Sequence, residues 1–147
     1  MLATAESCTG GWVAKSCTDL AGSSIWFERG FVTYSNEAKQ ELLGVQAATL
    51  DKHGAVSQPV AEEMARGTLQ HSRADVSVAL TGIAGPGGGS AQKPVGTVWI
   101  SWGIRHGDIL SICYHFGGDR ESVRRQAVFE ALTGLIKILQ AADSRVN

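Results

Sequence analysis

Two stretches of alternating apolar positions, residues 98–104 and 110–116, constrain the fold of this chain most strongly. Alternation with a period of two places one set of side chains on each face of a β-strand. The residues between the two stretches, Arg105-His106-Gly107-Asp108, have the composition of a tight turn. The pattern therefore predicts an antiparallel hairpin, and any sheet that contains it includes antiparallel strands.

Short strands and helices alternate through the rest of the chain. A final helix is expected after the capping residue Asp119, because apolar residues recur every four positions from Val123 to Leu139. Neither a repeat nor a linker divides the sequence, so we expect residues 1–147 to form a single domain, a layered α/β sandwich with a mixed sheet. The other strands are expected at residues 2–5, 31–34 and 75–81, and the other helices at 10–18, 37–43, 49–53 and 58–71.

Charge and cysteine content exclude several classes of protein. The chain has 13 Lys and Arg against 14 Asp and Glu and no basic run, so neither nucleic acid nor a membrane surface is an expected partner. No apolar stretch approaches the ~20 residues of a membrane span, and no signal sequence opens the chain. Cys8, Cys17 and Cys113 are scattered, and neither they nor the histidines show ligand spacing. We therefore expect a reduced, cytoplasmic protein without a metal site.

Glycine is the compositional outlier, because its 18 residues are nearly double the usual share of about 7%. Two of these glycines lie in the turn Glu6-Ser7-Cys8-Thr9-Gly10-Gly11, where a strand leads into a helix. Free N–H groups and the helix dipole make such a turn an anion site, so Ser7, Thr9 and Gly10 are candidate substrate contacts. The alternative is that Ser7 or Thr9 only caps the helix and the glycines only permit the turn.

A second glycine-rich turn, residues 81–90, follows the predicted strand 75–81. In α/β folds ligands bind beyond the carboxyl ends of strands, and a loop without side chains lets its amides face a phosphate or a carbonyl oxygen. Thr81, Gly82 and Gly85 are therefore candidate binding residues. The turn is neither a P-loop nor a dinucleotide fingerprint, and it is also compatible with a flexible connector.

Ser24, Tyr34 and Lys39 lie at successive breaks between predicted elements. A lysine acts as a general base only where burial or nearby positive charge lowers its pKa from about 10.4. A serine hydroxyl deprotonated by such an amine is the Ser/Lys form of nucleophilic catalysis. The alternative is that Lys39 is an ordinary solvated lysine.

Arg120 and Arg124 share one face of the final helix, four residues apart. Such a pair is suited to clamping a phosphate. A solvated first turn with mixed ion pairs explains the same charge pattern.

Taken together and in this order, these segments resemble the CinA C-terminal domain family. The residues that carry the resemblance span nearly the whole chain: 4–11 (TAESCTGG), Gly22-Ser23-Ser24 with Phe27, 32–39 (VTYSNEAK), Gly54-Ala55-Val56-Ser57, 81–89 (TGIAGPGGG), 93–98 (KPVGTV), and Gly118-Asp119-Arg120 with Arg124.

The resemblance implies hydrolysis of the carboxamide of nicotinamide mononucleotide (NMN) to nicotinic acid mononucleotide and ammonia, in pyridine-nucleotide salvage. It implies a Ser/Lys mechanism without metal or cofactor, in which a serine attacks, Lys39 accepts its proton, and Tyr34 relays or positions that proton toward the leaving ammonia. Both Ser24 and Ser7 are eligible nucleophiles, and Ser24 is preferred because Ser7, at a helix N-terminus, is as readily a substrate contact.

The resemblance also favours a homodimer. Relatives usually carry a helix ahead of the first strand, whereas this sequence opens at Met1-Leu2 beside the motif, so one flank of the sheet is expected to be uncovered or completed by a partner subunit. The competing interpretation is a non-catalytic nucleotide-binding or regulatory module, suggested by the association of the family with competence and DNA damage.

Overall fold

A five-stranded mixed sheet in the order β2-β1-β3-β4-β5 organises the computed structural model, which describes residues 1–144. Strand β1 is parallel to β2 and β3, whereas β4 is antiparallel to β3 and β5. This confirms the hairpin and the mixed α/β sheet. Of the domain expected over residues 1–147, residues 145–147 lie outside the described part. The strands are β1 (Leu2–Glu6), β2 (Phe27–Val32), β3 (Val76–Gly82), β4 (Thr97–Ile104) and β5 (Ile109–His115).

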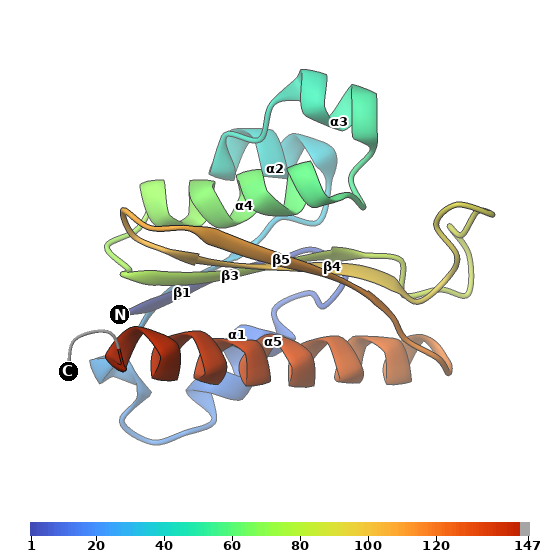
Figure 1. Cartoon of the computed structure of the whole chain (residues 1–147). Helices are drawn as coiled ribbons and strands as arrows, with labels where there is room; N and C mark the ends of the chain where they lie inside the picture. The colour runs from blue at the N-terminus through green and yellow to red at the C-terminus, as the bar shows by residue number, and fades with distance from the viewer. Residues whose placement is uncertain (145–147) are drawn as a thin grey trace.

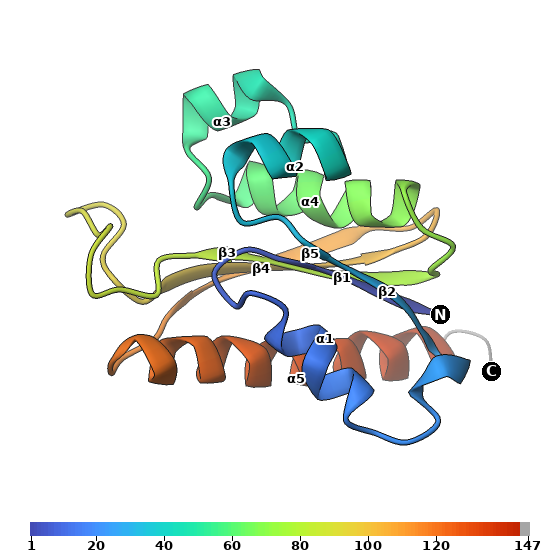
Figure 2. The same ribbon diagram turned by 180° about the vertical axis from the view of Figure 1, so that it is seen from behind.

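Helices cover both faces of the sheet (Figures 1 and 2). On one face, α1 (Trp12–Thr18) and α5 (Arg120–Asp143) enclose a core that includes the buried Trp102. The other face carries α2 (Asn36–Leu43), α3 (Ala47–His53) and α4 (Gln58–Gln70), whose core includes Met64. A short 3₁₀ helix, η1 (Ser23–Ile25), precedes β2. The sheet is therefore the middle of three layers, as expected for a layered α/β sandwich.

Strand β2 was not correctly predicted, because it begins at Phe27 and ends at Val32 rather than covering residues 31–34. It is an edge strand and lacks the alternating pattern of a strand with one buried face. Its Gly30 packs against β1, where an added Cβ would lie 2.9 Å from Thr4 Oγ1. Thr33 and Tyr34 consequently follow the strand, beyond its carboxyl end.

Helix α1 also differs from its prediction, because it begins at Trp12 rather than at Gly10. Gly10 and Gly11 have φ angles of +60° and +101°, a left-handed conformation that glycine adopts without strain. The two glycines therefore form the turn ahead of the helix rather than its first residues.

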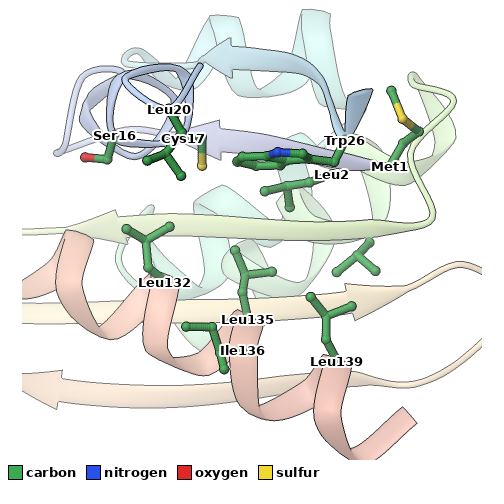
Figure 3. A pocket seen from close by; sticks show the side chains of 11 residues that line it. Met1, Leu2, Ser16, Cys17, Leu20, Trp26, Leu132, Leu135, Ile136 and Leu139 are labelled. Carbon is green, nitrogen blue, oxygen red and sulfur yellow. The ribbon is translucent and has the colours of Figure 1, made fainter. Parts of the chain in front are cut away.

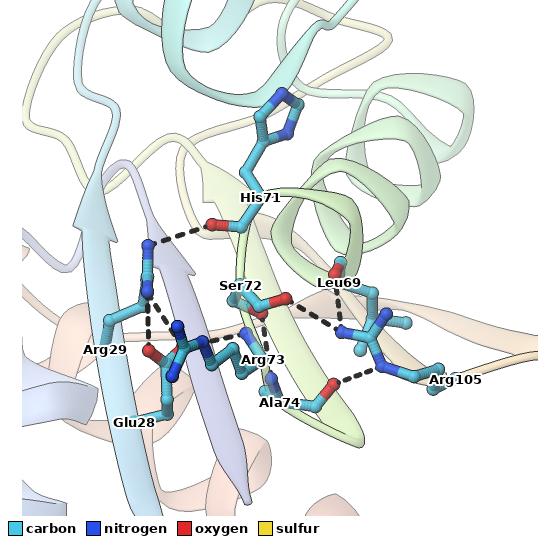
Figure 4. Close-up of polar contacts among 8 residues, drawn as sticks. All are labelled: Glu28, Arg29, Leu69, His71, Ser72, Arg73, Ala74 and Arg105. Carbon is cyan, nitrogen blue, oxygen red and sulfur yellow. Dashed lines mark hydrogen bonds and ion pairs between the residues drawn. The ribbon is translucent and has the colours of Figure 1, made fainter.

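The connection from α4 to β3 is fixed by two arginines (Figure 4). Arg105 donates to the carbonyl oxygens of Leu69, Ser72 and Ala74 at 2.7–3.0 Å. Arg29 donates to the carbonyl oxygen of His71 at 3.0 Å. These bonds satisfy carbonyls in the last turn of α4 and in the loop that follows it, and they hold this loop at the end of the sheet where β1, β2 and β3 begin.

Candidate active site

Most of the predicted site residues meet at the carboxyl ends of the three parallel strands, β1, β2 and β3. Glu6, the last residue of β1, is in register with Val32 of β2 and Leu80 of β3. The segments that continue from these ends therefore leave the sheet side by side, as at the ligand crevice of other α/β sheets. The residues on these segments and on the first turns of α2 and α5 are Ser7, Tyr34, Lys39, Thr81, Gly82, Gly85, Arg120 and Arg124.

Ser7 and Lys39 form the centre of this group. Lys39, in the first turn of α2, is only 1% exposed, and its Nζ donates to Ser7 Oγ at 3.1 Å. The same amine donates to the backbone carbonyl oxygens of Thr33 and Tyr34 at 3.0 and 3.3 Å. Ser35 accepts from Ala38 N as the N-cap of α2, which fixes the start of the helix that carries Lys39.

The surroundings of Lys39 lower the pKa of its amine. Burial is the main cause, and the neighbouring Cys8 and Glu37 act in the opposite direction. A neutral amine has two N–H groups and one lone pair. In the structure Nζ donates to three oxygens, as an ammonium group does; once the amine loses a proton, its lone pair is available for the hydroxyl proton of Ser7. The geometry therefore matches that of a base beside a nucleophile.

Ser24 lies away from this group of residues. It is an exposed residue of η1, directly ahead of β2, whereas Ser7 follows the end of β1. Because β1 and β2 are parallel, the start of β2 and the end of β1 lie at opposite ends of the strands. Within one chain, the structure thus brings Lys39 to Ser7 and not to the preferred Ser24.

Tyr34 and Arg120 form the outer part of the site. The side chain of Tyr34 is 60% exposed, and its hydroxyl accepts from Arg120 Nη2 at 3.1 Å. Arg120 also donates through Nη1 to the carbonyl oxygen of Gly85 at 2.8 Å. It is the backbone carbonyl of Tyr34, not its hydroxyl, that contacts Lys39. Arg120 thus joins the start of α5 to both the Tyr34 segment and the glycine-rich loop.

The turn that leads into α1 is not free to bind an anion through its helix terminus, contrary to our expectation. The carboxylate of Glu6 already accepts from the backbone N–H groups of Val13 and Ala14, at 2.7 and 3.0 Å. It also accepts from Thr9 Oγ1 at 2.7 Å, so this hydroxyl points into the buried turn. A carboxylate of the chain itself fills the position expected for an anionic ligand.

Arg124 supports the same turn from outside. It donates to the carbonyl oxygens of Cys8 and Thr9 at 3.1 and 3.2 Å, and its guanidinium lies 5.4 Å from the ring centroid of Trp12. A Cβ on Gly10 would lie 3.6 Å from the Nη2 atom of Arg124. Arg120 and Arg124 therefore hold different backbone segments rather than forming a single clamp.

The end of β3 is closely packed. Thr81 is 1% exposed and donates to the carbonyl oxygen of Ala55 at 2.9 Å. Gly82 remains within β3, and Ile83 N donates to the carbonyl oxygen of Thr97. The amides of Ile83 and of Ser90, which donates to the carbonyl oxygen of Lys93, are thus engaged within the chain.

The role of Glu6 was missed by the sequence argument, although a signal for it was present. A glutamate at the end of an apolar strand, followed after three residues by a threonine and then by a helix, is the composition of a local cap.

Across residues 1–144, no group of three or more His, Cys, Asp or Glu side chains is placed to hold a metal ion. No helix in that range is long and apolar enough to cross a membrane.

Comparison with known sequences places the chain in a family. The sequence model of the CinA C-terminal domain matches residues 1–139. The chain belongs to the CinA C-terminal domain family. It is 61% identical over 132 residues to the nicotinamide-nucleotide amidohydrolase PncC of Escherichia coli K12, covering 90% of this chain and 80% of that protein.

Longer proteins and solved structures share the same CinA C-terminal domain. A CinA-like protein of Akkermansia muciniphila is 52% identical over 134 residues, which are 91% of this chain and 32% of that protein. The crystal structure of the competence/damage inducible protein CihA of Agrobacterium tumefaciens superimposes with a TM-score of 0.92 at 51% identity. That match covers 93% of this chain and 84% of the other. The fold described above is therefore the fold of the family.

Proposed function

We propose that this chain is a nicotinamide-nucleotide amidohydrolase that hydrolyses the carboxamide of NMN to nicotinic acid mononucleotide and ammonia, in pyridine-nucleotide salvage. The contact between Lys39 Nζ and Ser7 Oγ, at 3.1 Å in a buried setting, is the observation that carries this proposal. Relatives that carry the name of this activity, at up to 61% identity over most of the chain, support the choice of substrate.

Ser7 replaces Ser24 as the nucleophile in the mechanism that we propose. Ser7 Oγ attacks the carboxamide carbon while its proton passes to Lys39 Nζ. The tetrahedral intermediate then breaks its C–N bond, and ammonia leaves with the proton from Lys39. Water attacks the resulting ester of Ser7, again with Lys39 as base, which releases the acid and restores the hydroxyl.

Substrate contacts are proposed at the mouth of the site. Arg120 is exposed and cationic beside the glycine-rich loop, so it is the proposed partner of the 5′-phosphate. The amides of the glycines in this loop, from Gly85 to Gly89, are proposed to meet the developing oxyanion or the nucleotide. Because the hydroxyl of Tyr34 contacts Arg120, we propose that Tyr34 orients this arginine rather than relaying a proton.

An ammonia-release assay with NMN, nicotinamide and glutamine compared side by side tests the function. We expect release from NMN alone, because the other two amides lack the ribose phosphate that Arg120 and the loop are proposed to hold. Binding of NMN without release from any of the three would instead support a non-catalytic nucleotide-binding module.

We also propose that the protein is a cytoplasmic homodimer. The three cysteines are free, in agreement with a reducing compartment.

A groove of about 550 Å³ between α1 and the second half of α5 is lined almost wholly by apolar side chains (Figure 3). Several of the lining residues are themselves exposed, including Leu20 at 62%, Ile136 at 57% and Leu139 at 50%. Contiguous apolar surface of this kind is typical of interfaces, and a second copy of the chain is the proposed occupant.

Light scattering after size-exclusion chromatography tests this arrangement. We expect a dimer for the unchanged chain and a monomer for Ile136→Asp, because a buried carboxylate without a partner opposes association. Leu42→Asp is the matched control, since Leu42 is 44% exposed on α2, on the other face of the sheet, and should leave the dimer intact. A monomeric unchanged chain would contradict the proposal.

A further inference from the structure

Glu6 is a fully buried carboxylate whose contacts are all local. It is 0% exposed, and its two oxygens accept from Thr9 Oγ1, Val13 N and Ala14 N. No lysine or arginine among residues 1–144 pairs with it. Every contact is a donor, so both oxygens of the side chain act as acceptors.

These bonds close the turn that carries Ser7. The carboxylate connects the end of β1 to the first turn of α1, so residues 7–11 are held between two fixed points. The backbone of Ser7 is fixed as well, because Ser7 N donates to the carbonyl oxygen of Leu80, and Thr33 N donates to the carbonyl oxygen of Glu6. Strand pairing thus fixes the start of this turn, and the Glu6 carboxylate fixes its end at α1.

We propose that Glu6 is a positioning residue, which holds the turn so that Ser7 Oγ lies within hydrogen-bonding distance of Lys39 Nζ. This rests on the proposed function of Ser7 as nucleophile. A displacement of about 1 Å at a reacting group is sufficient to lower a rate by about 10²-fold. A second effect, on folding, is expected too, because Glu6 also caps α1. The experiment must separate the two.

Glu6→Gln changes the contacts and preserves the size of the side chain. The amide oxygen of the glutamine can replace only one of the two carboxylate oxygens. The NH₂ group then faces the N–H of Ala14 or of Val13, so that two donors oppose each other. We expect kcat for NMN to fall by about 10²-fold. We expect KM to change by less than about threefold, because the proposed substrate contacts lie on Arg120 and the loop.

Glu63→Gln is the matched control, since Glu63 has the same kind of role at α3. Its carboxylate accepts from Thr49 Oγ1 at 2.6 Å and Gln46 N at 2.8 Å, at the start of another seven-residue helix. It makes no contact with Ser7 or Lys39. A comparable drop in Tm with unchanged kcat is expected for this variant. Equal losses of kcat in the two variants would overturn the positioning role.

The reactivity of Ser7 gives a readout that does not depend on NMN. Ser7 Oγ attacks the sulfur of phenylmethylsulfonyl fluoride, fluoride leaves, and the hydroxyl proton passes to Lys39. We expect Glu6→Gln to slow this reaction per folded molecule by a factor similar to that in kcat. An unchanged rate would overturn the proposal. If the reagent modifies Ser7 of the unchanged chain but this chain releases no ammonia from NMN, the substrate assignment fails. The test of Glu6 still stands in that case.

Thr9 provides a milder variant in case Glu6→Gln does not fold. Thr9→Val removes one of the three donors and leaves both backbone bonds of Glu6 in place. We expect kcat to fall by about tenfold, in keeping with a smaller displacement than in Glu6→Gln. Thr9→Ser, which retains the hydroxyl, should recover most of the loss. An unchanged kcat in Thr9→Val would contradict the positioning role.

Discussion

Ser7→Ala is expected to lower kcat for NMN hydrolysis by about 10⁴-fold or more, because removal of a nucleophile disables the covalent pathway as a whole. The substitution deletes only the hydroxyl that accepts from Lys39 Nζ at 3.1 Å. It leaves the backbone bond from Ser7 N to Leu80 in place, so folding should be little affected. Initial rates of ammonia release and the Tm of the same preparation measure the two effects separately.

Ser24→Ala is the informative comparison for this prediction. Ser24 is exposed on η1, so its loss is expected to change kcat far less than the loss of Ser7. The reverse order, with an active Ser7→Ala and an inactive Ser24→Ala, would contradict Ser7 as nucleophile. A second copy of the chain would then have to bring Ser24 to Lys39.

Much of the fold was predictable from the sequence because its signals are local. The period-two stretches predict β4 and β5, and the four-residue steps predict α5, whose N-cap Asp119 accepts from Ser122 N. Strand β2 was not predictable in the same way. It lies at the edge of the sheet with little burial, so its boundaries are set by pairing with β1 and by the close approach of Gly30 to Thr4.

The candidate site was predictable as a set of residues but not as a set of contacts. Ser7 and Lys39 are 32 positions apart, and only the register of the parallel strands places them together. Nothing in the sequence indicates that Arg124 would hold the carbonyls of residues 8 and 9, and the local signal at Glu6 does not say which backbone N–H groups its carboxylate would meet. Local composition identifies charged and hydroxyl groups, whereas their partners depend on the packing of distant segments.

Lys39→Met is expected to lower kcat/KM by about 10³-fold, within the range for loss of a general base. Methionine resembles the apolar part of the lysine, but it leaves the carbonyl oxygens of Thr33 and Tyr34 without this donor. That loss and the removal of a buried ionisable group act in opposite directions, so we expect the Tm to change little. A large loss of activity without a loss of stability would show that Lys39 acts in the reaction as a base and is not needed for folding.

The pH dependence gives the decisive form of this test. Burial lowers the pKa of Lys39, so the neutral amine is reached below the pH of about 10.4 that an exposed lysine requires. Only the neutral form accepts the proton of Ser7. As pH falls through the lowered pKa, the amine gains a proton, and kcat/KM should fall about tenfold per unit. Lys39→Met should abolish this dependence over the same range, whereas a loss of kcat/KM at low pH that persists in the variant would assign the titration to another group.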